Sequence, residues 1–240
     1  MRPIQRGTSP QTGDFGDYAY AKPELIGRLG AYCSYCERPI PTNLAVEHIQ
    51  PKKGPHGHPA LEGRWENFLL ACVNCNSTKR DKQVVLADVL LPVRDNTFAA
   101  LTYTQDGKVS AATGLAAATA TLRLVGLDKA ISVVMDANGK QVAIDRVSQR
   151  MQAWLVAEES KADVDAEPAS AGLRRQVVRT AVATGFFSIW MRVFSADSDM
   201  LCRLIDAFPG TQGSGCFNHT TGATVAPAPN PDGLADGGKA

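Results

Sequence analysis

The second half of the chain carries apolar residues at the spacing of amphipathic helices. Between residues 141 and 161, apolar side chains recur at i, i+4, i+7 and i+8, which places them on one face of a helix. These side chains are Val147, Met151, Trp154 and Leu155. Two later segments repeat the pattern with Leu173, Val177, Val178 and Val182, and with Leu201, Leu204, Ile205 and Phe208. We expect these faces to pack on one another as a helical core, with docking of a partner as the alternative.

Other elements are bounded by glycine, proline and turn residues. Residues 23–29 predict a short helix that ends at Gly30, and the Ala-rich residues 113–127 predict a helix up to Gly126. Residues 99–110 predict a β-hairpin around the Asp106-Gly107 turn. Small and acidic residues between 162 and 171 indicate a flexible bend between helices.

The first third of the chain predicts short strands and loops rather than long amphipathic helices. Residues 44–48 predict a short strand, and residues 50–63, rich in Pro, Gly, Lys and His, predict an exposed loop. A second strand follows within residues 65–70, beginning near Asn67, and residues 74–82 predict a short helix with basic residues near its end. The order is strand, loop, strand, helix.

Composition indicates a soluble globular protein. The chain has 240 residues, 44% of them apolar and 20% charged, with a net charge of +1 and a pI near 7.6, so there is no global attraction to nucleic acid. Residues 48–82 carry six Lys or Arg against three Asp or Glu, a local excess that could face phosphates. The start of the chain lacks the apolar run of a signal peptide, and no later run reaches membrane-spanning length.

Two Cys-x-x-Cys pairs bracket the strand, loop and strand. Cys33 and Cys36 form the first pair, and Cys72 and Cys75 form the second. Two such turns supply the four thiolate ligands of a closed, structural zinc site. Zinc thiolates without a leader sequence fit the reducing cytoplasm better than a disulfide-bonded secreted fold. Cys216 and His219 are too isolated from further ligands to suggest a second metal site.

Residues with the chemistry of phosphodiester hydrolysis lie between the pairs. His48 ends the first predicted strand, and a histidine has the pKa needed to take a proton from water near neutral pH. Glu47 and Asn76 offer one carboxylate and one amide oxygen, which is how Mg²⁺ is commonly held with waters filling its other positions. Metal binding would offset the charge that develops on the phosphate.

The motif resembles the HNH, or His-Me finger, endonucleases with zinc-binding cysteines. The matching residues are Cys-x-x-Cys, Glu-His-Ile-x-Pro, an Asn before an apolar strand, and Cys-x-x-Cys-Asn-x-x-Lys. The resemblance implies that His48 is the general base and that Asn67 braces its loop. It implies that Glu47 and Asn76 hold a catalytic ion.

The resemblance also implies that Lys79 contacts phosphate. Asn76 stands where many family members have His, and this variant favours Mg²⁺, with Mn²⁺ also suitable, over softer metals.

Each of these residues has a simpler interpretation. The cysteines could form a zinc ribbon without catalysis, and His48 could be a partly buried structural histidine. Asn76 could cap the helix, and Lys79 could belong to a solvated helix end. His56 and His58 are interpreted as loop residues rather than ligands. A zinc-dependent module that binds nucleic acid or protein without cutting is therefore the competing function.

A second, softer resemblance covers residues 1 to about 217. A Tyr-x-x-Asp-Gly hairpin, a helix entering Val-Gly-Leu, and a late Phe-Ser-Ile-Trp-Met segment are similar to the HNH nuclease subunit of Septu and retron-type antiphage systems. That resemblance implies a bacterial defence effector restrained by an ATPase partner.

Together these features predict an α+β protein, with a zinc-stapled ββα-metal finger set in a mainly α-helical body that includes a β-hairpin. We expect an N-terminal arm and short helix over 1–30, the HNH nuclease core over 31–83, the hairpin and helical body over 84–209, and a disordered tail over 210–240. The expected activity is Mg²⁺-dependent cleavage of nucleic acid, with DNA as the expected substrate and RNA or tRNA as the rival.

Overall fold

The computed structural model describes residues 1–130, 134–135, 141–143 and 145–240. Its described helices are α1 (Lys22–Leu29), α2 (Val73–Lys79), α3 (Thr97–Ala100), α4 (Ala116–Val125), α5 (Arg146–Ala166), α6 (Ala171–Thr184), α7 (Phe187–Val193) and α8 (Ser198–Ala207). Its strands are β1 (Ala45–His48), β2 (Phe68–Ala71), β3 (Leu101–Tyr103), β4 (Val109–Ala111), β5 (Val134–Met135) and β6 (Gln141–Ala143). The α+β prediction is confirmed.

The predicted strand, loop, strand and helix are present in that order. β1 and β2 pair antiparallel, so that Ala45 lies opposite Ala71 and His48 lies opposite Phe68. The chain then passes directly from β2 into α2, whose N-cap is Cys72, because the thiol of that residue accepts a hydrogen bond from the Cys75 amide at 3.4 Å. Asn76 lies inside the helix, so the interpretation of Asn76 as its cap is wrong.

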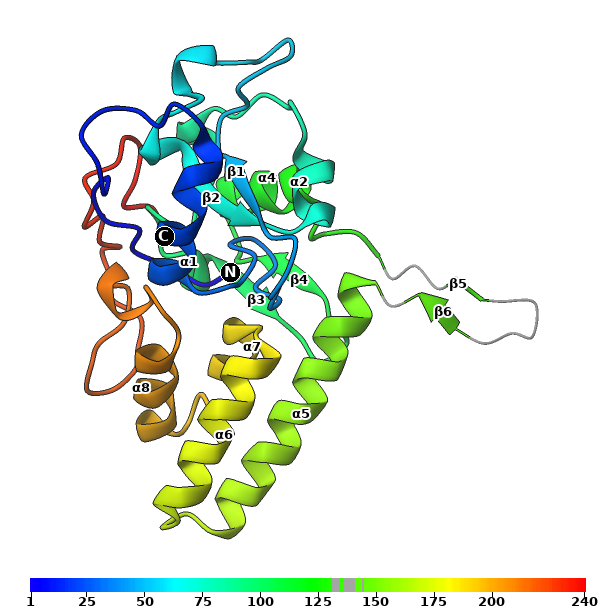
Figure 1. Ribbon diagram of the computed structural model, residues 1–240. Coiled ribbons are helices and arrows are strands. Elements are labelled where there is room, and N and C mark those ends of the chain that lie inside the picture. Colours follow the sequence, from blue (N-terminus) through cyan, green and yellow to red (C-terminus); the bar gives the residue numbers. More distant parts are fainter. Residues whose placement is uncertain (131–133, 136–140, 144) are drawn as a thin grey trace.

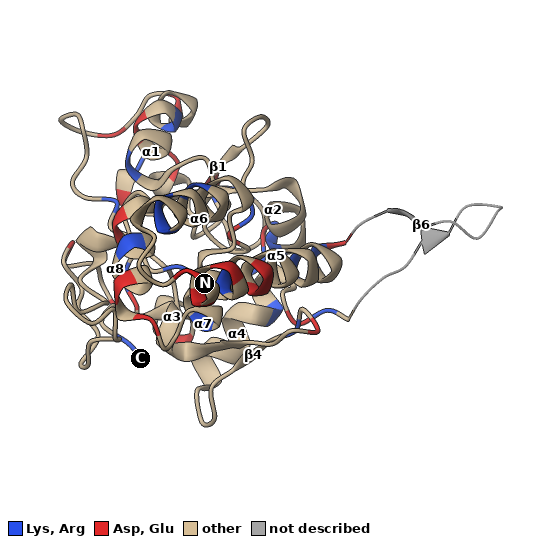
Figure 2. Ribbon diagram, turned by 90° about the horizontal axis from the view of Figure 1, so that it is seen from below, with Lys and Arg blue, Asp and Glu red and all other residues tan. Residues whose placement is uncertain are grey.

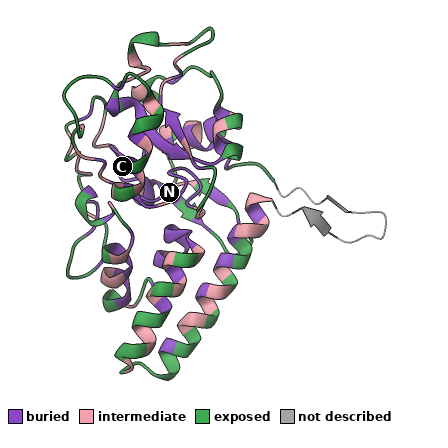
Figure 3. Cartoon of the chain, in the orientation of Figure 1, coloured by how far each residue is buried: buried purple, intermediate pink, exposed green. Residues whose placement is uncertain are grey.

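The helical body lies below this finger in Figure 1. α5 packs against α6 and α7, and α8 packs against α6 and α7. Figure 3 shows buried positions along the inner faces of these helices and around β1 and β2. Aromatic rings fill the body, and the ring centroids of Phe187 and Phe208 are 5.3 Å apart.

The structure confirms the two predicted helix ends at glycine and the predicted β-hairpin. α1 ends at Gly30, and α4 ends at Gly126, whose φ of 66° is the left-handed conformation that a residue with a Cβ adopts only with strain. β3 and β4 form the predicted hairpin. None of the helices within the described ranges has the length and apolar character needed to cross a membrane.

α5 differs from its prediction in both extent and buried face. It begins at residue 146 rather than 141 and continues to Ala166, so the predicted bend is confined to residues 167–170; residue 144, within the predicted helix, lies outside the described residues. Val147 is buried, but Met151 and Leu155 are 37% and 54% exposed. Buried Ala153 and Ala157 belong to the inner face instead. Small side chains let a neighbouring helix approach closely, a feature that counting large apolar residues misses.

The N-terminal segment is not a free arm. The amino group of Met1 is buried 2.9 Å from the Glu37 carboxylate, which directly follows the first cysteine pair. Arg6 is also buried and donates from Nη1 to the Phe68 carbonyl at 2.6 Å. These polar contacts, which hydrophobic patterning cannot detect, fix the segment against the finger.

The C-terminal segment also differs from the predicted disordered tail. Phe217 is buried, and the Asp232 carboxylate accepts from the Gly7 amide at 2.8 Å. Lys239 donates from Nζ to the Leu86 and Val89 carbonyls, both at 2.7 Å. These hydrogen bonds, which the composition of the segment does not reveal, hold it against the rest of the protein.

Replacing a buried leucine and an exposed leucine of the helical body by alanine should change the free energy of unfolding by different amounts. Leu204→Ala should destabilise the protein by about 2–5 kcal/mol, since Leu204 is fully buried at 0% exposure. Leu155→Ala is the matched control and should change the free energy of unfolding by less than about 0.5 kcal/mol. Urea unfolding monitored by tryptophan fluorescence measures both; similar losses in the two variants would contradict the assigned inner face of α5.

Candidate active site

The four predicted zinc ligands converge. The Sγ atoms of Cys33, Cys36, Cys72 and Cys75 all lie within 4.8 Å of one another, and all four residues are buried. With zinc–sulfur bonds of about 2.3 Å, the edges of a tetrahedral site are about 3.8 Å long. The Cys36 and Cys72 sulfurs are 3.8 Å apart. The cluster therefore fits zinc in both ligand chemistry and size.

The four thiols interact closely, and their pKa values move in different directions. Hydrogen bonds with Cys33, Cys36 and Cys75 lower the pKa of Cys72 far below its ordinary value, whereas hydrogen bonds among the same thiols raise the pKa values of Cys36 and Cys75. Arg146, at the start of α5, donates from Nη1 to the Cys75 sulfur at 3.3 Å. The cysteine motif gives no signal for Arg146, because this contact spans 71 residues of the chain. This contact brings positive charge from the helical body to the sulfur ligands.

His48 is held at the end of β1 in a defined orientation. Its Nε2 atom lies 2.9 Å from the Glu62 carbonyl oxygen. A carbonyl can only accept, so Nε2 carries the proton and Nδ1 is left as the acceptor. Tyr18 and Phe68 contact the ring edge-on, with centroids 4.8 and 5.3 Å away. Burial lowers the pKa of His48, which favours the neutral imidazole.

Asn67 joins the two sides of the loop that follows His48. Its Oδ1 atom accepts from the Gln50 amide at 2.8 Å, and its Nδ2 atom donates to the Gln50 carbonyl at 2.9 Å and the Leu61 carbonyl at 3.2 Å. The backbone of Ile49 also donates to the Asn67 carbonyl. The side chain thus ties both ends of the loop together just beyond the end of β1.

Glu47 and Lys79 form a buried ion pair. Oε1 of Glu47 lies 2.8 Å from Nζ of Lys79, and the same ammonium donates to the His48 carbonyl at 2.7 Å. Burial raises the pKa of Glu47, an effect that the neighbouring Lys79 charge opposes. Lys79 is 1% exposed. In this conformation its ammonium is used inside the protein, which differs from the predicted phosphate contact.

A polar pocket of 260 Å³ brings most of the predicted residues together. His48, Glu47, Asn76 and Lys79 all line it, whereas Asn67 lies behind the loop and lines a separate hollow with Gln50. The pocket's lining includes neither His56 nor His58.

The pocket also contains residues that sequence analysis did not select. They are Tyr18, Lys52, Lys53, Arg80 and Asp81. Lys52 lies 3.6 Å above the Tyr18 ring and pairs with Glu62 at 2.8 Å. The basic residues could have been suspected from the local charge excess. Tyr18 had no such signal, because the fold brings it from outside the motif.

Charge elsewhere is mixed in sign. Figure 2 shows acidic positions along α5 beside basic positions of α6. Within the described ranges, the cysteines form the one group of three or more His, Cys, Asp or Glu residues placed to share an ion. Any second metal at the pocket would rely on few protein ligands, as Mg²⁺ commonly does.

Comparison with known proteins agrees with this geometry. Residues 33–82 match the family model described as HNH endonuclease. No curated protein matches the chain. The matched segment contains both cysteine pairs and the pocket residues from Val46 to Asp81. The chain therefore carries an HNH endonuclease domain and is a nuclease that hydrolyses phosphodiester bonds of nucleic acid.

Loss of one cluster thiol should remove the metal and unfold the finger, because the energy of structural zinc binding is folding energy. Cys72→Ser should purify without stoichiometric zinc and lose its cooperative thermal transition. Cys202→Ser is the control, since Cys202 is half-buried and outside the cluster. Metal analysis and circular dichroism measure the outcome; a Cys72→Ser protein that retained zinc and melted like wild type would contradict the assigned cluster.

Proposed function

We propose that this protein is a Mg²⁺-dependent endonuclease that uses His48 to activate water, with DNA as its substrate. The observation that carries the proposal is the hydrogen bond between His48 Nε2 and the Glu62 carbonyl at 2.9 Å. It leaves Nδ1 as a proton acceptor in a residue that lines a polar pocket. A packed structural histidine can make the same hydrogen bond, and the match of residues 33–82 to the HNH endonuclease family model favours the role of general base.

The role of His48 follows from its protonation and surroundings. A neutral imidazole can take one proton from water as the water oxygen bonds to phosphorus; the bond from phosphorus to the ester oxygen breaks, and the departing oxygen takes a proton from solvent. The lowered pKa keeps the base in its neutral form near pH 7. The Glu62 carbonyl accepts a hydrogen bond from the ring and stabilises the positive charge that the ring gains. Contacts with Tyr18 and Phe68 restrict rotation of the imidazole.

Glu47 and Asn76 are the residues proposed to hold Mg²⁺. Both line the pocket and offer oxygen atoms, which suit this ion. When bound, Mg²⁺ would neutralise charge on the scissile phosphate. Asp81 offers a further carboxylate at the pocket wall. Lys79 fixes Glu47 and the end of β1, so we assign it a positioning role.

The substrate contacts are assigned to exposed cations. Lys53 and Arg80 are exposed and Lys52 is half-exposed, and all three line the pocket. Cations at such positions bind the phosphate backbone, which sets the register of a strand without selecting its sequence. DNA of many sequences fits this pattern, and RNA, including tRNA, remains the rival substrate.

The second motif resemblance supports a finer proposal. We place the protein in the cytoplasm of a bacterium as the effector of an antiphage system, held inactive by an ATPase partner. The support is the Tyr-x-x-Asp-Gly hairpin and the late Phe-Ser-Ile-Trp-Met segment, which lie outside the matched HNH residues.

His48→Ala should reduce cleavage of supercoiled plasmid by at least about 10²-fold, the usual contribution of a general base. His56→Ala is the matched control, because His56 is exposed and is not part of the pocket lining. Wild type without added Mg²⁺ should also fail to cut. Equal cutting by His48→Ala and wild type would remove His48 from the mechanism, and preferential cutting of an RNA of the same sequence would reassign the substrate.

The defence role predicts a genetic result. Cells that carry the gene with its genomic neighbours should restrict phage plating, and His48→Ala should abolish the restriction while His56→Ala preserves it. An ATPase should co-purify with the tagged protein. Restriction that persists in the His48→Ala strain would contradict an effector role for this nuclease.

A further inference from the structure

A second polar hollow lies on the opposite face of α2 from the active pocket. Its volume is 280 Å³. Along the helix, Asn76, Lys79 and Arg80 face the active pocket at i, i+3 and i+4. Asn74, Ser77 and Thr78 have the same spacing two residues earlier, about 160° around the helix, and line the second hollow. The segment after α4 and the first turns of α5 form its other walls.

Positive charge dominates this hollow. Lys129, Arg146 and Arg150 line it, against one carboxylate from Asp145. Asp145 is the N-cap of α5 and accepts from the Ser148 amide at 2.8 Å. None of the three cations forms an ion pair with another described residue. Three positive groups therefore share a small space with one negative group.

Arg150 indicates a missing ligand more directly than the net charge of the hollow does. Its side chain is 2% exposed, and its Nε atom donates to the Gly107 carbonyl at 2.6 Å. Its Nη1 atom is buried and has no hydrogen-bond partner among the residues that the structure describes. A buried, charged donor without an acceptor is costly. An anion in the hollow that Arg150 lines would supply the missing acceptor.

Arg146 is already oriented by protein groups. Its Nη1 atom donates to the Val125 carbonyl at 2.8 Å, and its Nη2 atom donates to the Gly126 carbonyl at 2.5 Å. These acceptors, together with the Cys75 sulfur 3.3 Å from Nη1, hold the guanidinium in place at the wall of the hollow. The N-terminus of α5, a helix of 21 residues, adds the positive end of its dipole beside the same hollow.

We infer that this hollow, defined by Lys129, Arg146 and Arg150, binds a phosphate group. Three converging cations suit an oxyanion with several acceptor oxygens, and Arg is well suited to phosphate. The volume is near the lower end of the range for small-molecule sites, which accommodates a phosphate or a single nucleotide. The phosphate comes from a free nucleotide or from a nucleic-acid strand that extends beyond the active pocket.

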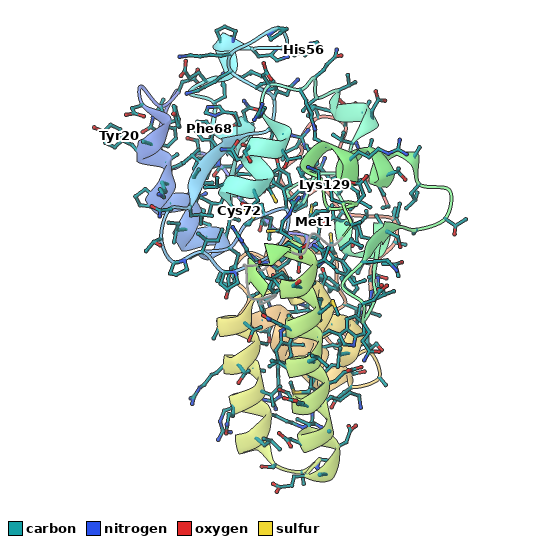
Figure 4. All side chains as sticks on the ribbon, turned by 90° about the vertical axis from the view of Figure 1, so that its right-hand side faces the viewer. Met1, Tyr20, His56, Phe68, Cys72 and Lys129 are labelled. Atoms are coloured by element: carbon teal, nitrogen blue, oxygen red, sulfur yellow. The ribbon has the colours of Figure 1, made fainter. Side chains whose placement is uncertain are left out.

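The hollow lies between the nuclease finger and the helical body, so a ligand bound there contacts both. Two of the zinc ligands are Cys72, the N-cap of α2, and Cys75 within the helix, and the face of α2 opposite the hollow bears Asn76 and Lys79. In Figure 4, Lys129 and Cys72 are both labelled in the upper half of the view, above the long helices of the body. A phosphate held between α2 and α5 ties the nuclease finger to the helical body, so its occupancy links the two parts of the protein.

Binding measurements on the zinc-loaded, full-length His48→Ala protein test the inference without cleavage. The probes are inorganic phosphate, ATP and a short single-stranded DNA, each titrated without added Mg²⁺. Lys129→Glu and Ser77→Glu place a carboxylate at the hollow, and both positions are exposed, so folding should persist. Arg175→Glu makes the same change of charge on an exposed position of α6 and serves as control.

We expect both hollow variants to bind at least about tenfold more weakly than the parent and the control to remain within about twofold. Weaker binding of phosphate or ATP identifies a nucleotide-type ligand, whereas weakening of DNA binding alone identifies a strand phosphate. Unchanged binding of all three probes, or an equal loss in Arg175→Glu, overturns the inference. Because cleavage is not measured, this result is independent of the role assigned to His48.

Discussion

The convergence of four sulfur atoms is the constraint on which the rest of the structure depends. The two cysteine pairs are separated by 35 residues, and the segment between them contains two short strands, flanked by the buried Leu44, Ile49 and Trp65. A four-residue strand pair is marginal alone in water. A metal that draws both pairs together closes this segment into a loop and adds binding energy to its stability. The metal thus adds to the stability that the buried apolar side chains of the strands supply.

Other parts of the molecule meet at the same cluster. Glu37, the residue after the first pair, receives the buried Met1 amino group and two donors from Ser188, at 2.7 and 2.6 Å. Arg146 reaches the Cys75 sulfur from α5. The N-terminal segment, the finger and the helical body are thus joined within a few residues of the sulfur ligands.

The cluster also determines the geometry of the pocket. The Ser34 amide, inside the first cysteine pair, donates to the Leu70 carbonyl of β2 at 2.8 Å. β2 then aligns β1, and the second pair starts α2. β2 ends and α2 begins at the second cysteine pair, and β1 runs beside β2 with His48 opposite Phe68. His48 and Asn76 therefore face one pocket although they lie on different elements. Short, rigid connections make this placement reproducible.

The sequence was informative wherever chemistry depends on local spacing. The cysteine pairs, Glu47-His48 and Asn76 occur within one motif, and the structure brings them together around the cluster and the pocket. Tyr18, Arg146 and Arg150 could not be found in this way, since their contacts depend on tertiary folding. The exposed Met151 and Leu155 show the same limit, because helical periodicity does not report which face of a helix a neighbour covers. The C-terminal segment shows it as well, because its hydrogen bonds to distant residues cannot be recognised from its composition.

Anomalous X-ray diffraction from crystals grown with Mn²⁺ in place of Mg²⁺ tests the central claim most directly. Data collected around the zinc and manganese absorption edges locate each metal independently. The account predicts zinc at the centre of the four cysteine sulfurs and manganese in the pocket beside His48, next to Glu47 and Asn76. Zinc absent from the sulfur cluster, or manganese bound elsewhere with the pocket empty, would contradict it.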